Sequence, residues 1–397
     1  MAAPASAMYY ESGGTKLWLV PNSGSSVDLN PSGPIHLQDI KGYPFGLFYG
    51  TELMTGLGIF VDVAPITGEA VDDTGLIRET SIFRAADTPG SNIRITWNYA
   101  LELTDKRADI WAYSGEGAEY STTAAWGKVH EGGLNATEAQ LDNVQVGDGK
   151  NSYYRVVPSG TAQGGIFNLA MNARTVGKVD VEVYGPASGN SFKYNYVSVP
   201  LIQHSDILLD VFGIQLVPRA DQGSASEIWG WGGTSFARQA YLKTTGWIKV
   251  NTPNTPADFA HEYGAGYFIK TKTGQPDISM TLVGIVNTGI FEYTGSVPVR
   301  ANLYSSLADP YPISIPLGAL GLNDVLKSGA VSGSADQIWG WTGNSFGAQS
   351  FLMSNLTWAI VTGATQKVDY FEPGKAYLLK RIDSTTGAVI WKFIPQL

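Results

Sequence analysis

The stretch Ile228-Trp229-Gly230-Trp231 recurs as Ile338-Trp339-Gly340-Trp341, 110 residues further along the chain. The same offset relates further pairs of residues: Ser235-Phe236 with Ser345-Phe346, Glu262 with Glu372, Tyr267 with Tyr377, and Lys270 with Lys380. A register this constant indicates an internal duplication whose period is the size of a domain. We therefore expect two copies of one module, at residues 178–285 and 286–397.

Two further matches depart from this offset. Trp247 corresponds to Trp358 at 111 residues, a local shift of one. Upstream, residues 197–201 (VSVPL) match residues 313–317 (ISIPL) at an offset of 116. Both of these upstream segments alternate in the way that is typical of a half-buried strand.

Each copy has the pattern of a β module. Side chains two residues apart lie on the same face of a strand, so both Trp residues of each motif are expected on one face. Turn residues such as Gly232-Gly233-Thr234 and Thr342-Gly343-Asn344 follow directly, which indicates a hairpin. Charged residues are only 15% of the chain, and it has 47 glycines. The sequence predicts an all-β fold of tandem β-sandwich domains, the last two being a duplication.

The composition excludes several classes of function. The chain has 397 residues, a formal net charge of −9 and no cysteine. No basic face is available to neutralise phosphates, so we expect no nucleic-acid partner. The lack of cysteine removes disulfides, thiolate metal sites and a cysteine nucleophile. No apolar run reaches the ~18 residues of a membrane helix, so we expect no membrane-spanning segment.

Two other domains are expected before the duplication. Residues 92–97 alternate and end on Trp97, and residues 149–158 carry a Tyr-Tyr-Arg-Val-Val strand after an acidic-glycine turn. These segments resemble strands B and F of a fibronectin type III domain, which implies a spacer or binding module at 91–177. Residues 1–90 are loosely similar to bacterial sandwich domains of the cohesin kind. The residues at 88–91 are the clearest linker signal.

The search for catalytic residues finds no convincing site, and we expect no enzyme. The four histidines are scattered without metal-ligand spacing. Gly343-Asn344-Ser345-Phe346-Gly347 fits a nucleophile elbow, but a hairpin turn explains it better. Carboxylates that a glycosidase would need are available but cannot be paired from sequence: Asp72, Asp73, Glu116, Glu119, Asp206 and Asp210.

Two ligand sites remain as hypotheses. Acidic turns at Asp72 and Asp73, and from Asp142 to Asp148, carry oxygen ligands for calcium, although a solvated turn is the simpler interpretation. Trp229 with Trp231, and Trp339 with Trp341, would form a platform for stacking against sugar rings. The same residues would also serve as core. No other cofactor is expected.

The duplicated motif resembles repeats near the C-termini of large secreted bacterial proteins, which implies an extracellular or cell-surface location. Ala5-Ser6-Ala7 has the form of a signal-peptide cleavage site, and a flexible tail accounts for it equally well. We expect a structural protein of a filament, surface layer or adhesive structure that associates with itself or with other surface proteins. Met8-Tyr9-Tyr10 is a candidate strand for donation to a neighbour. The alternative is a carbohydrate-binding protein that holds polysaccharide on its Trp pairs.

Overall fold

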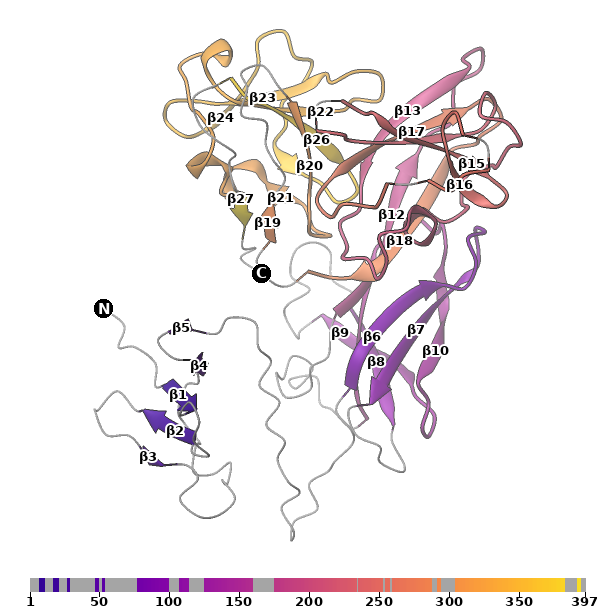
Figure 1. The fold of residues 1–397 in the computed structure, drawn as a ribbon, viewed down its shortest axis with the longest axis vertical. Coiled ribbons are helices and arrows are strands. Elements are labelled where there is room, and N and C mark those ends of the chain that lie inside the picture. The colour runs from indigo at the N-terminus through magenta and orange to yellow at the C-terminus, as the bar shows by residue number, and fades with distance from the viewer. Residues whose placement is uncertain are drawn as a thin grey trace. The chain divides into compact units, whose positions relative to one another are not determined.

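The computed structural model describes residues 77–99, 107–113, 125–159, 175–233, 235–252, 254–257, 259–287 and 304–382, with seven short strands outside these ranges. The chain divides into two compact units, Met1–Val71 and Asp72–Leu397. Strands dominate the described residues, so the predicted all-β fold is confirmed (Figure 1). The described helices are short: α1 (Leu208–Phe212), η4 (Leu317–Ala319), η5 (Leu322–Asp324) and η6 (Ser332–Ser334). Within the described ranges, no helix has both the length and the apolar character needed to cross a membrane.

The first unit contains a five-stranded sheet in the order β3-β2-β1-β4-β5. Its strands are β1 (Ala7–Tyr10), β2 (Leu17–Val20), β3 (Val27–Asp28), β4 (Leu47–Tyr49) and β5 (Glu52–Leu53). β1 pairs antiparallel with β2 and parallel with β4, so a strand of the same chain lies on each side of it. Residues 8–10 therefore belong to a central strand, and a strand so placed is not available for donation to a neighbour.

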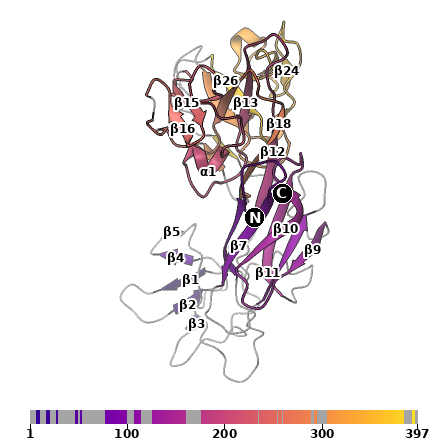
Figure 2. The same cartoon turned by 90° about the vertical axis from the view of Figure 1, so that its right-hand side faces the viewer.

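The second unit begins with a β-sandwich. One layer is the sheet β10-β7-β6 and the other is the sheet β18-β12-β11-β8-β9. The first layer contains β6 (Ile77–Arg84), β7 (Asn92–Tyr99) and β10 (Glu138–Gln145). The second layer contains β8 (Ala108–Tyr113), β9 (Trp126–Glu131), β11 (Ser152–Pro158), β12 (Thr175–Val183) and β18 (Ile278–Ile285). Figure 2 labels β7 and β10 of the first layer and β9 and β11 of the second. Trp97 of the first layer packs inward in one buried cluster with Ile110 and Val156 of the second.

Strand pairing moves the predicted domain boundaries. β6 pairs with β7, so residues 88–91 form the turn of a hairpin and not a linker between domains. β12 runs through the predicted boundary at 177 and pairs with β11 on one side and with β18 on the other. Figure 1 shows β12 and β18 side by side. β18 lies within residues 178–285, the range that the sequence predicts for copy 1. Because a domain boundary does not divide a continuous strand, the sandwich extends through β12 and includes β18.

The two copies form sheets with the same strand order, as the predicted duplication requires. Copy 1 has the order β13-β17-β14-β15-β16 and copy 2 the order β20-β26-β22-β23-β24. Copy 1 contains β13 (Phe192–Ser198), β14 (Glu227–Gly230), β15 (Arg238–Lys243), β16 (Gly246–Lys249) and β17 (Gly266–Lys272). Copy 2 contains β20 (Tyr304–Ala308), β22 (Gln337–Gly340), β23 (Ala348–Leu352), β24 (Trp358–Ile360) and β26 (Ala376–Lys380). A further strand pair joins β19 (Phe291–Tyr293) to β27 (Trp391–Phe393).

The register of the strands agrees with the offset of the repeat. Trp229 lies opposite Phe268 in copy 1, and Trp339 lies opposite Leu378 in copy 2. Both partners of the second pair are 110 residues after those of the first. The offset of 111 between Trp247 and Trp358 arises in the hairpin turn that precedes each of them. The turn is one residue longer in copy 2, where Leu352 pairs with Trp358, than in copy 1, where Leu242 pairs with Trp247.

The match at an offset of 116 does not relate equivalent positions. Val197 of β13 lies opposite Tyr267, and Leu307 of β20 lies opposite Tyr377, so the equivalent of Val197 is Leu307, at the usual offset of 110. Residues 313–317 instead contain β21 (Ile315–Pro316), which pairs with β25 (Tyr370–Phe371). Both segments alternate apolar and polar residues, and this shared pattern produced the match.

Each duplicated motif divides its side chains between two faces. Ile228 and Ile338 are fully buried in the main hydrophobic core. Trp229 and Trp339 follow them in the chain and therefore lie on the opposite face of the sheet, in a separate cluster. The alternation places the Trp side chains outside the core of their own copy.

Candidate functional site: the aromatic interface between the two copies

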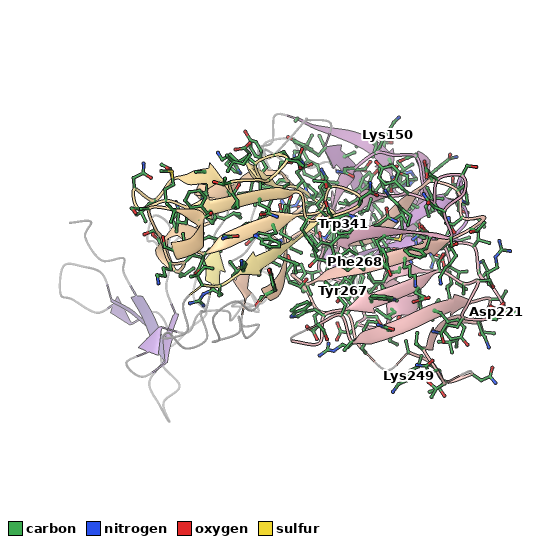
Figure 3. The ribbon with its side chains drawn as sticks, turned by 90° about the horizontal axis from the view of Figure 1, so that it is seen from above. Lys150, Asp221, Lys249, Tyr267, Phe268 and Trp341 are labelled. Atoms are coloured by element: carbon green, nitrogen blue, oxygen red, sulfur yellow. The ribbon has the colours of Figure 1, made fainter. Side chains whose placement is uncertain are left out.

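The faces that carry the Trp residues meet in one cluster, which we call the aromatic interface. Copy 1 contributes Tyr194, Tyr196, Trp229, Trp231, Phe236 and Phe268. Copy 2 contributes Tyr304, Trp339, Trp341, Phe346, Ala376 and Leu378. Figure 3 labels Phe268 and Trp341, whose rings meet edge to face with centroids 5.1 Å apart. The two copies therefore pack on each other through the faces that carry the Trp residues. For these faces the sequence predicts either ligand binding or burial in a core.

Equivalent residues of the two copies touch each other at the middle of the aromatic interface. The hydroxyl groups of Tyr196 and Ser306 are 2.7 Å apart, and these residues are separated by the repeat offset of 110. Gly266 and its equivalent Ala376 are also neighbours, because a Cβ atom on Gly266 would overlap that of Ala376. Contact between equivalent positions is the property of an interface with two-fold symmetry, so the copies are related by a local two-fold axis.

The first Trp of each motif has the same surroundings in both copies. Trp229 Nε1 donates to Glu227 Oε2 at 2.8 Å, and Trp339 Nε1 donates to Gln337 Oε1 at 2.8 Å. A lysine ammonium lies 5.2 Å from each ring centroid, that of Lys270 over Trp229 and that of Lys380 over Trp339. Cation–π attraction and the indole hydrogen bond fix both rings in place.

The cluster is more strongly charged in copy 1. The Lys270 ammonium also lies 5.2 Å from the ring of Phe192 and 5.7 Å from that of Tyr194. It lies 3.5 Å from Glu227, which Lys272 approaches at 3.1 Å. Burial, and then the negative charge of Glu227, raise the pKa of Tyr194. The chain's own lysine thus occupies this group of three aromatic rings.

The four predicted platform residues come together, although not as two open platforms. Trp229, Trp231, Trp339 and Trp341 are all half-buried in the aromatic interface. Trp231 meets Phe236 edge to face at 4.9 Å, and Trp341 meets Phe346 in the same way at 5.1 Å. Trp341 Nε1 donates to the carbonyl oxygen of Tyr194 across the two copies at 3.2 Å. A flat stacking surface would require parallel exposed rings.

Ser345 lies in the hairpin turn after the second motif. Its carbonyl oxygen accepts a hydrogen bond from the Thr342 N–H at 2.8 Å, and the turn joins β22 to β23. Copy 1 has the same bond from Gly232 to Ser235. A nucleophile elbow requires a helix after the serine, whereas here a strand follows. His261 is buried beside Phe212, and burial lowers its pKa to about 4.

The calcium candidate Asp148 has a lysine as its partner. Lys178 Nζ lies 2.5 Å from Asp148 Oδ1, and the backbone N–H groups of Gln145 and Lys150 also donate to this carboxylate. Burial raises the pKa of Asp148, but the bond from Lys178 and the backbone bonds outweigh it, so the pKa lies below its ordinary value. An ammonium group therefore stands where the acidic turn was expected to hold a metal.

Lys178 is the centre of this charged group, and no prediction from the sequence included it. No part of its side chain is exposed, and its ammonium contacts Asp148, Asp180 Oδ2 at 2.9 Å and the Lys150 carbonyl at 2.7 Å. Asp180 Oδ1 accepts a hydrogen bond from the Thr281 hydroxyl at 2.6 Å. Burial raises the pKa of Asp180 despite these contacts. The available signal was the spacing of Lys178, Asp180 and Glu182, which places these charged residues on one face of β12.

Several predicted residues lie apart from the aromatic interface or outside the described residues. The residues outside the described part of the chain are Asp72, Asp73, Glu116 and Glu119, together with the side chain of Asp142. The carbonyl oxygen of Asp206 accepts a hydrogen bond from the His261 N–H, and Asp210 lies in α1. In the described ranges, no three acidic or histidine side chains gather as metal ligands would.

Comparisons with known proteins add no family. No protein-family model matches the chain, and no curated protein matches its sequence.

Proposed function

We propose that this chain is an extracellular structural protein, a subunit of a filament, surface layer or adhesive structure that assembles through its β domains. One observation carries the proposal: among the described strands, β24 ends the sheet of copy 2 and is apolar. Ile360, at its end, is 46% exposed, and Leu356, in the turn before it, is 50% exposed. An edge strand that presents apolar side chains is a template for another chain.

The duplication supplies an internal comparison for this edge. Lys249 of β16 pairs with Ala240, and Ile360 of β24 pairs with Ser350, so Lys249 and Ile360 are equivalent edge residues. Lysine at an edge strand discourages pairing with a second molecule, because its charge would have to be desolvated. Residues 255–257 also cover the edge of β16, since the Lys249 N–H donates to the Thr255 carbonyl and the Ala257 N–H donates to the Trp247 carbonyl. Copy 1 thus has a lysine and a covered edge where copy 2 has Ile360, which favours β24 as the contact surface.

The connections between the modules also support a structural role. β12 belongs to the sandwich, and residues 184–191 connect it directly to β13 of copy 1. The Tyr153 hydroxyl of the sandwich donates to the Pro312 carbonyl at 2.7 Å, next to copy 2. We propose that the sandwich of sheets β10-β7-β6 and β18-β12-β11-β8-β9 is a fibronectin type III-like spacer module. Modules held by direct contacts transmit force better than modules on flexible linkers.

We expect the protein to self-associate through β24, and Ile360→Lys to keep it monomeric, because the substitution restores the charge that copy 1 has. Sedimentation velocity over a range of concentrations measures this. Val331→Lys is the matched control, since Val331 is 61% exposed and lies outside the edge strand. Wild type and the control should gain mass with concentration. A wild-type monomer at every concentration would contradict assembly, and an Ile360→Lys variant that associates normally would exclude β24.

The alternative function, polysaccharide binding on the Trp pairs, has less support. The indole N–H groups of Trp229, Trp339 and Trp341 are already bonded within the chain. A lysine covers each of the first two rings. A sugar would have to displace these contacts before it could stack.

A further inference from the structure

A groove on copy 2 opens beside the aromatic interface. Its volume is about 260 Å³, room for a sugar ring. Its lining contains the aromatic residues Tyr196, Trp341, Tyr370 and Tyr377, together with the polar side chains of Gln366, Lys367, Asp369, Glu372 and Lys375. Concave sites that join aromatic rings to a few polar groups are the usual form of small-ligand sites.

Tyr370 and Trp341 differ in how their rings are held. Tyr370, in β25, is 51% exposed. Trp341 is half-buried. Its indole N–H donates to the Tyr194 carbonyl oxygen of copy 1, with 3.2 Å between nitrogen and oxygen, and this bond fixes the ring. An exposed ring next to a fixed one offers apolar area without a large loss of side-chain entropy on binding. The apolar face of a sugar ring is suited to such a surface.

The polar groups of the groove form neutral pairs. Lys367 Nζ lies 2.8 Å from Asp369 Oδ1, and Lys375 Nζ lies 2.6 Å from Glu372 Oε2. Each pair places donors beside acceptors while its charges offset each other. A ligand with adjacent hydroxyl groups, which donate and accept at once, suits this arrangement. An anion or a cation would find no net charge to attract it.

The equivalent region of copy 1 keeps the glutamate, as Glu262, but lacks the tyrosine and the lysine of Tyr370 and Lys375. The Tyr267 hydroxyl accepts from the Glu262 N–H, and the Tyr377 hydroxyl accepts from the Glu372 N–H, which aligns the two segments at the offset of 110. By this alignment Tyr370 corresponds to Ala260, and Lys375 corresponds to Ala265. The shared fold therefore forms without the tyrosine and the lysine, so folding alone does not account for their presence in copy 2.

We propose that this groove of copy 2 is a binding site for a neutral saccharide and that the equivalent region of copy 1 is not. Tyr370 stacks on the sugar ring, and the Lys367–Asp369 and Lys375–Glu372 pairs exchange hydrogen bonds with its hydroxyl groups. The inference rests on the groove alone and is independent of self-association through β24.

Native affinity electrophoresis of the full chain tests the proposal, with hydroxyethyl cellulose, galactomannan, pullulan and dextran as neutral probes and alginate as an anionic one. We expect at least one neutral polysaccharide to retard the wild type, and Tyr370→Ala to weaken that binding at least about tenfold. Tyr184→Ala is the matched control, because Tyr184 is 48% exposed and lies outside the groove. Circular dichroism checks that both variants are folded.

Retardation that is lost in Tyr370→Ala and kept in Tyr184→Ala would support the site. Three results would overturn it: no retardation of the wild type by any neutral probe, retardation by alginate alone, or a Tyr370→Ala variant retarded as strongly as the wild type.

Discussion

Lys178→Met should destabilise the protein by about 3–5 kcal/mol, the typical cost of removing one partner from a buried ion pair. The side chain of Lys178 is completely buried, and that of Asp180 is 1% exposed. Methionine has a similar length but carries no charge, so the variant leaves the Asp180 carboxylate buried without its cation. Urea unfolding of the variant and the wild type measures the loss as a lower midpoint.

A second substitution distinguishes lost pairing from lost packing. In the double variant Lys178→Met with Asp180→Asn, no uncompensated charge remains at position 180, so much of the stability should return. Lys375→Met is the surface control, because Lys375 pairs at 2.6 Å with Glu372 and both side chains are exposed. That variant should unfold at the wild-type midpoint. Equal midpoints for Lys178→Met and Lys375→Met would contradict a buried charged group at Lys178.

Phe268→Ala should also cost about 3–5 kcal/mol, as expected for a large aromatic removed from a packed region. Phe268 is 8% exposed and stacks on Tyr196 with ring centroids 4.6 Å apart. It also contacts Phe236 at 4.7 Å and Trp341 of the other copy at 5.1 Å. Its truncation leaves a cavity between the copies, and thermal or urea unfolding measures the effect.

Phe192→Ala is the matched control for this prediction. Phe192 lies on the same face of the copy 1 sheet, but it is 47% exposed and makes fewer aromatic contacts. We expect its loss to cost less than about 1 kcal/mol, as for most surface substitutions. If Phe268→Ala were as stable as Phe192→Ala, the two copies would not be packed against each other through this cluster.

The sequence was sufficient to predict the duplication and the faces of its strands. Identical residues at a constant offset reveal the repeat, and the two-residue period of a strand places Trp229 and Trp231 on one face. The period does not reveal what covers that face. A neighbouring copy and a ligand both favour aromatic side chains, so the role of the Trp residues depended on tertiary structure.

The domain boundaries and the acidic turn show a second limit. β12 pairs with β18, and nothing local in either strand specifies that partner. Asp148 has the oxygen ligands of a calcium site, but its partner Lys178 is 30 residues away. Turn chemistry is visible in a short stretch of sequence, whereas contacts between distant residues are not.

The two copies are related by a local two-fold axis, and a double-mutant cycle between Tyr196 and Ser306 tests this relation most directly. These equivalent residues have hydroxyl groups 2.7 Å apart in a buried position. Tyr196→Phe, Ser306→Ala and the double variant should give a coupling free energy of about 1 kcal/mol, the usual contribution of a hydrogen bond. Tyr153→Phe combined with Ser306→Ala should be additive, because the Tyr153 hydroxyl bonds to Pro312. A coupling between Tyr196 and Ser306 no larger than in that control pair would contradict the two-fold interface.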